Sequence, residues 1–148
     1  MRSLQRVLSG SLVMILVLSG CGSGSKVLAI CNEANSALSV LTSDEIVPSY
    51  SADWRQIQKT YAGIKSKLQD LSSQASDLDE TQLARDFSSV SKNAGEIEAV
   101  ASFIITIAGG DASDNVIQSS WLEAVNKLTG NEALRSPSDR TFIGCKSN

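Results

Sequence analysis

Residues 54–108 read WRQIQKTYAGIKSKLQDLSSQASDLDETQLARDFSSVSKNAGEIEAVASFIITIA. Two runs of this stretch, residues 54–78 and residues 83–108, carry apolar side chains at alternating spacings of three and four residues. Such spacing places one apolar stripe along each of two helices. The stripes therefore predict a helical hairpin with its turn near residues 77–80. The apolar positions are Trp54, Ile57, Tyr61, Ile64, Leu68, Leu71, Ala75 and Leu78, followed by Leu83, Phe87, Val90, Ala94, Ile97, Ala101, Ile104 and Ala108.

The turn between the two stripes carries a signal of its own. Asp79 is followed three residues later by Gln82, which is the spacing of a capping pair at the start of a helix. We therefore expect these two side chains to cap the second helix of the hairpin.

Two further helices are predicted on either side of the hairpin. The first covers residues 26–41, and Pro48 follows its end. The other starts at Ser113 or Asp114 and ends before Gly130. Each has one apolar face, formed by Val27, Cys31, Ala34, Leu38 and Leu41 in the first and by Ile117, Trp121, Val125 and Leu128 in the other.

Four apolar stripes with short connections predict an all-α fold, a four-helix up-down-up-down bundle. The same stripes would also suit a coiled coil between chains, and the sequence leaves this alternative open. In the bundle, the start of the first helix and the end of the last lie at the same end as the turn near residues 77–80. The loops over residues 42–49 and 109–114 then form the opposite end, which we call the distal end.

The composition is that of one globular domain without histidine. The chain has 148 residues, 42% of them hydrophobic and 20% charged, and a net charge of −3. Residues 1–20 contain two Arg and no acidic residue, so the remainder has 11 basic and 16 acidic residues. An acidic surface suits nucleic-acid phosphates poorly, and we expect no nucleic-acid partner. The lack of His removes the Ser-His-Asp and Cys-His nucleophile arrangements and His-ligated zinc, and we expect no enzymatic activity.

The first 20 residues have the parts of a secretory signal: a basic start with Arg2 and Arg6, an apolar run over residues 7–18, and small residues before a cut. The sequence Leu18-Ser19-Gly20-Cys21 resembles the lipobox of bacterial lipoproteins. The resemblance implies that the Cys21 sulfur receives a diacylglyceryl group and that a peptidase cuts just before it. It further implies that the new amino group takes another acyl chain such as palmitate.

The lipobox resemblance also predicts the location and the division of the chain. We expect a signal peptide over residues 1–20, an acylated cysteine with a short flexible linker over residues 21–25, and a helical domain over residues 26–148. The domain is expected outside the cytoplasm, held on the cell membrane by lipid. Position 22 is Gly rather than Asp, which in a host with two membranes resembles cargo sorted to the outer membrane.

Lipidation of Cys21 leaves two cysteines in an oxidising compartment, Cys31 and Cys145. We expect a disulfide between them that staples the N- and C-terminal ends of the bundle; two separate buried thiols are the alternative. No metal or cofactor is expected. Residues 111–115 offer oxygen ligands at the spacing of a calcium loop, but Val116 and Leu122 stand where that loop needs Gly and a bidentate acid.

Residues 99–108 are apolar nearly all round the predicted helix, which is more than one bundle interface requires. Either neighbouring helices cover this one on all sides, or it forms a distal apolar groove for a lipid, peptide or partner helix. The topology places Trp54 and Trp121 in the distal half beside Phe103, and these three residues are the candidate partner surface.

These features favour a lipid-anchored helical interaction module, expected to be a monomer, that binds an unknown protein or envelope component through its distal end. A carrier or sensor that holds a small apolar ligand inside the bundle is the alternative, and a cavity beside the two tryptophans would favour it. A structural spacer and an enzyme built on carboxylates also stay open.

Overall fold

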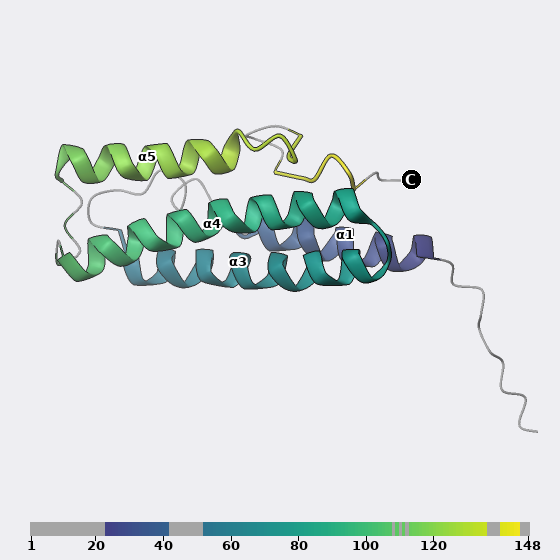
Figure 1. The fold of residues 1–148 in the computed structure, drawn as a ribbon. Coiled ribbons are helices and arrows are strands. Elements are labelled where there is room, and N and C mark those ends of the chain that lie inside the picture. Colours follow the sequence, from purple (N-terminus) through teal and green to yellow (C-terminus); the bar gives the residue numbers. More distant parts are fainter. Residues whose placement is uncertain are drawn as a thin grey trace, which may run out of the picture.

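The computed structural model describes residues 23–41, 52–107, 109, 111, 113–135 and 140–145. These ranges contain four α-helices and no named strand, and the helices run alternately up and down (Figure 1). The predicted all-α four-helix bundle is confirmed. The helices are α1 (Ser23–Ser39), α3 (Trp54–Asp77), α4 (Thr81–Ile107) and α5 (Asn115–Thr129).

The start of α1 differs from the expectation. The helix begins at Ser23, three residues earlier than predicted, so residues 23–25 belong to α1 rather than to a flexible linker. Gly24 lies in this first turn, where a side chain would meet no atom within 4 Å.

The α3–α4 hairpin is the centre of the molecule, and both apolar stripes are buried along it. Every predicted stripe position from Trp54 to Ala75 on α3 and from Leu83 to Ile104 on α4 is buried. One polar side chain is buried between the two helices: Ser91, whose hydroxyl donates a hydrogen bond of 2.9 Å to the Lys65 carbonyl. The expected hairpin is therefore confirmed.

The turn between α3 and α4 is built from backbone hydrogen bonds rather than from the expected capping pair. The Glu80 N–H donates to the Ala75 carbonyl and the Asp79 N–H to the Ser76 carbonyl, which is the Schellman arrangement at a helix end. Asp79 has φ +61°, in the left-handed region that glycine adopts more easily. The predicted pairing of Asp79 with Gln82 is wrong, because the Gln82 amide donates to Asp86 instead.

The two outer helices are staggered along this hairpin (Figure 1). Glu33 of α1 forms an ion pair with Lys67 of α3, so α1 lies beside the C-terminal half of α3. Lys127 of α5 lies 3.3 Å from Glu96 of α4, so α5 lies beside the C-terminal half of α4. Helix α1 therefore covers the half of the hairpin nearest the turn, and α5 covers the distal half.

The C-terminal segment, described over residues 131–135 and 140–145, packs beside α1 and α4 near the turn (Figure 1). Phe142 is fully buried, and its ring meets Phe87 edge-on with 4.7 Å between centroids. The Phe142 N–H donates to the Asn35 side chain, and Arg140 donates to the Leu41 carbonyl. The segment contains one isolated antiparallel bridge, between residues 134 and 142.

A disulfide joins Cys31 of α1 to Cys145, with 5.3 Å between the Cα atoms. Both cysteines are buried. The predicted bridge is confirmed, and it staples the start of the bundle to its C-terminal segment at the end where the α3–α4 turn lies. Cys21 lies outside the described residues.

Candidate functional site

The two tryptophans of the candidate partner surface are buried in the core. Their rings meet edge-on at 5.1 Å, and Tyr61 packs against Trp121 at 6.1 Å. Trp54 and Trp121 therefore expose little to a partner, and of the three predicted residues only Phe103 presents an exposed side chain. A hollow of about 180 Å³ lies beside Trp54, and Arg55 and Ile105 also line it.

Three exposed apolar side chains lie at the distal ends of α4 and α5. Phe103 is 51% exposed, Ile107 is 70% exposed and Val116 is 71% exposed. The expectation that neighbours cover α4 on all sides is therefore wrong. The buried face of α4 runs through residues 97, 101 and 104, and Phe103 and Ile107 lie beside this face rather than on it.

The register of α4 against α5 places these side chains at the same end of the bundle. The ion pair between Glu96 and Lys127 shows which positions of the two antiparallel helices lie opposite each other. Eleven residues after Glu96 comes Ile107, and eleven residues before Lys127 comes Val116. Eleven residues are close to three whole turns, so both return to the flank that holds the ion pair. Phe103 and Ile107 near the end of α4 and Val116 at the start of α5 are thus exposed apolar side chains of the distal end, and we call these three residues the distal patch.

The local sequence explains why α4 ends just after Ile107 and why α5 starts just before Val116. Gly109 takes φ +63°, a left-handed conformation that turns the chain out of α4. Asp114 then caps α5: its carboxylate accepts hydrogen bonds from the N–H groups of Val116, at 2.7 Å, and Ile117, at 3.3 Å. The cap holds Val116 in the first turn of α5, on the same level as Ile107.

Carboxylates border the distal patch. Asp111 and Asp114 lie in the connection at the distal end, and both are exposed. Hydrogen bonds from Ser113, its hydroxyl first and its N–H second, lower the pKa of Asp111, so this group stays ionised in mild acid. On the other side of the patch, Glu123 lies two turns after Val116 on α5.

The cation on this flank of α5 is Lys127, and two carboxylates share it. Lys127 lies 3.0 Å from Glu123 and 3.3 Å from Glu96. Hydrogen bonds that it donates, to Glu123 first and to Glu96 second, raise the pKa of Lys127. Two negative groups with one positive group leave this cluster negative, so the patch has acidic side chains at both of its ends.

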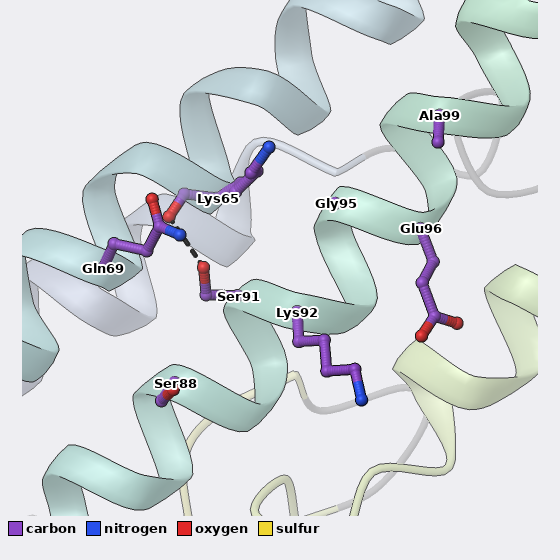
Figure 2. A pocket seen from close by; sticks show the side chains of 8 residues that line it. All are labelled: Lys65, Gln69, Ser88, Ser91, Lys92, Gly95, Glu96 and Ala99. Carbon is purple, nitrogen blue, oxygen red and sulfur yellow. Dashed lines mark hydrogen bonds between the residues drawn. The ribbon is translucent and has the colours of Figure 1, made fainter.

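A separate hollow of about 390 Å³ lies along the α3–α4 surface (Figure 2). Lys65 and Gln69 line it from α3, and Ser91, Lys92 and Gly95 are among the residues that line it from α4. Polar groups here bind one another: Ser91 donates to the Lys65 carbonyl, and the Lys65 amine lies 3.0 Å from Glu98. Figure 2 shows Lys92 and Glu96 extending away from Lys65 and Gln69, so the charged ends do not converge on one point.

In the described part of the chain, no group of three His, Cys, Asp or Glu residues is placed to hold a metal ion. No helix within the described ranges combines the length and hydrophobicity needed to cross a bilayer. No family model, curated protein or solved structure matches the chain.

Sequence reasoning predicted one of the three residues of the distal patch. Ile107 lies within the stretch 99–108 that was considered as a distal apolar groove, whereas Val116 was missed, although a signal was present: it is a large apolar residue that lies off the stripe of its helix. The stripe positions of Trp54 and Trp121, conversely, already indicated burial.

Proposed function

We propose that this protein is a lipid-anchored interaction module outside the cytoplasm, and that it binds a protein or envelope component through the distal patch. The observation that supports this proposal is the cluster of Phe103, Ile107 and Val116, exposed by half or more at one end of the bundle. Exposed apolar side chains that gather at one place on a surface mark interaction sites.

The arrangement of anchor and patch suits such a module. Cys21 precedes the first residue of α1 by two positions in the sequence, and the start of α1 lies beside the α3–α4 turn. The patch lies at the far end of α4, a helix of 27 residues. At 1.5 Å per residue this helix is about 40 Å long, so an upright domain would hold the patch about 40 Å above its anchor.

The proposed mechanism is recognition rather than chemistry. Binding would remove the three apolar side chains from water and provide the favourable free energy. The surrounding carboxylates would add little affinity but would orient the partner and discourage wrong ones. The ion pair of Lys127 with Glu96 and the hydrogen bonds from Asn131 to Ser89 and Asn93 join α5 to α4, so the ends of the two helices are positioned before the partner arrives.

Site-specific photo-crosslinking in cells tests the patch. We would place a photoreactive amino acid at position 103 of the full chain, and at position 122 in a matched control. Leu122 is 48% exposed, but lies about 120° around α5 from Val116. We expect a discrete crosslinked product from position 103 and none from position 122. No product from position 103, or equal products from both, would contradict a patch-mediated function.

The anchor is tested separately by Cys21→Ser. This variant removes the thiol that a diacylglyceryl group would modify. We expect it to leave the membrane fraction or to accumulate unprocessed, whereas Cys31→Ala, which changes a cysteine of the disulfide, should remain in the membrane fraction. A Cys21→Ser chain that is fully processed and still membrane-bound would refute the lipid anchor.

A further inference from the structure

A hollow of about 320 Å³ lies between the first turns of α1 and the end of α3. Both elements lie at the end of the bundle opposite to the distal patch (Figure 1), so we call this space the proximal hollow. Ala29 and Ile30 of α1 and Leu78 at the end of α3 form its apolar lining. Small-molecule sites span about 300–1,000 Å³, so a space of this size suits one small group rather than a partner helix.

Charged side chains line the proximal hollow from both helices. Lys26 and Glu33 come from α1, and Asp77 is the last residue of α3. Glu33 already forms an ion pair with Lys67. Lys26 and Asp77 are exposed, and neither forms an ion pair with another described residue. The hollow therefore offers one positive and one negative group to a ligand.

The proposed anchor brings the proximal hollow to the bilayer surface. Two peptide units join Cys21 to Ser23, the first residue of α1, and they span at most about 7 Å. Lys26 lies about 4.5 Å further along the helix axis, whereas Glu33 lies about 15 Å further. The headgroup layer on one side of a bilayer is about 5–8 Å thick, and long Lys side chains extend towards it. In an upright domain, Lys26 therefore reaches the headgroups and Glu33 lies above them.

Charge selects the kind of headgroup. Asp79 and Glu80 follow Asp77 in the α3–α4 turn, and Arg85, one turn into α4, does not line the hollow. Three carboxylates beside the single amine of Lys26 would repel an anionic headgroup. A zwitterionic headgroup instead offers a phosphate to the amine and an ammonium to a carboxylate. A primary ammonium also donates hydrogen bonds to a carboxylate, which the trimethylated ammonium of phosphatidylcholine cannot do.

Resting on the lipid anchor of the proposed function, we infer that the proximal hollow binds the headgroup of a phosphatidylethanolamine molecule in the anchoring bilayer. The Lys26 amine binds the lipid phosphate, and the Asp77 carboxylate accepts hydrogen bonds from the ammonium group. Ala29 and Leu78 contact the methylene groups between them. This second attachment beside Cys21 holds the domain upright, with the distal patch directed away from the membrane.

Photo-crosslinking from the hollow into lipid tests this inference. The full acylated chain is reconstituted in vesicles of equal parts phosphatidylethanolamine, phosphatidylglycerol and phosphatidylcholine, with a photoreactive amino acid at position 29, or at position 28 as the matched control. Leu28 is 45% exposed and adjoins Ala29, but it does not line the hollow. Mass spectrometry identifies the captured lipid. We expect position 29 to capture phosphatidylethanolamine at least about threefold more than either other lipid, and position 28 to capture all three about equally.

Two variants remove the charges that recognise the headgroup, and each has a control at the same end of the bundle. Lys26→Gln and Asp77→Asn should each reduce the preference of position 29 for phosphatidylethanolamine to less than about 1.5-fold. Arg85→Gln and Asp79→Asn remove charges of the same signs outside the hollow and should leave this preference unchanged. All four side chains are exposed, so the fold should persist, and the helical circular dichroism signal checks this.

Several results would overturn the inference. These are equal capture of the three lipids at position 29, a preference for phosphatidylglycerol, the same pattern at positions 28 and 29, and an equal effect of each variant and its control. Any of these results from a chain with a lipid on Cys21 contradicts the inference alone. A chain without that lipid contradicts the anchor as well, and the absence of a crosslinked product from position 103 contradicts the partner surface of the proposed function.

Discussion

Removal of the disulfide is expected to lower the free energy of unfolding by about 5 kcal/mol. Cys31 and Cys145 are 114 residues apart, so the bridge closes a loop that contains nearly the whole described domain. The chain-entropy relation for a loop of this length gives about 5 kcal/mol at 25 °C, because the reduced unfolded chain has many more conformations. Small domains are typically stable by about 5–15 kcal/mol, so the loss is a large fraction of the total.

The perturbation is the double variant Cys31→Ala, Cys145→Ala. Alanine is preferable to serine, because both sulfurs are buried and a hydroxyl would have to find a hydrogen-bond partner there. Urea unfolding of a soluble form that begins at Ser23, followed by circular dichroism, compares the variant with the oxidised chain. Reduction of the unmodified chain by a thiol reagent provides a control without substitution.

The contacts around the bridge predict how the reduced chain behaves before it unfolds. Phe142 stays buried against Phe87, and its N–H still has Asn35 as its acceptor, so the helical signal without urea should be unchanged. A loss of stability below about 1 kcal/mol would refute the reasoning. It would mean that the bridge does not stabilise the fold by restricting the conformations of the unfolded chain.

Three further expectations concern stability. Asp79→Gly should raise the free energy of unfolding by about 0.5 kcal/mol, since glycine adopts the positive φ of this position without strain, and a decrease in the urea midpoint would contradict the Schellman turn. Phe142→Ala should cost about 3–5 kcal/mol and expose the C-terminal segment to proteases, whereas Ile143→Ala, an exposed neighbour, should cost less than about 1 kcal/mol. Because the chain contains no His, unfolding free energy should be nearly constant from pH 6 to pH 8, and a change above about 1 kcal/mol, measured by urea unfolding, would reveal a buried titrating group.

Hydrophobic spacing predicted the helices because each helix here buries one continuous stripe. The predicted start of α5 agrees with its cap at Asp114, since an Asp before an apolar face satisfies the first N–H groups locally. The capping pair at Asp79 failed for a physical reason. The end of α3 used backbone hydrogen bonds to Ala75 and Ser76, and these placed Asp79 in the turn rather than at the cap of α4.

The candidate site was predicted less well than the fold. Topology placed Trp54, Trp121 and Phe103 correctly in the distal half, but position along a bundle does not decide exposure. Rotation about the helix axis decides it. The two tryptophans lie on stripes and are buried, whereas Phe103 lies beside a stripe and is exposed.

Besides the lipobox resemblance from which we propose the anchor, the sequence by itself determined the number and order of the helices, their alternating direction, and the pairing of Cys31 with Cys145. These follow from local spacing and from the small number of cysteines. Tertiary structure alone decided the stagger of α1 and α5 along the hairpin and the register of α4 against α5. That register depends on contacts between distant residues, such as Glu96 with Lys127. It places Phe103, Ile107 and Val116 at the same end of the bundle, and the rotation of each helix, which its neighbours set, leaves these side chains exposed.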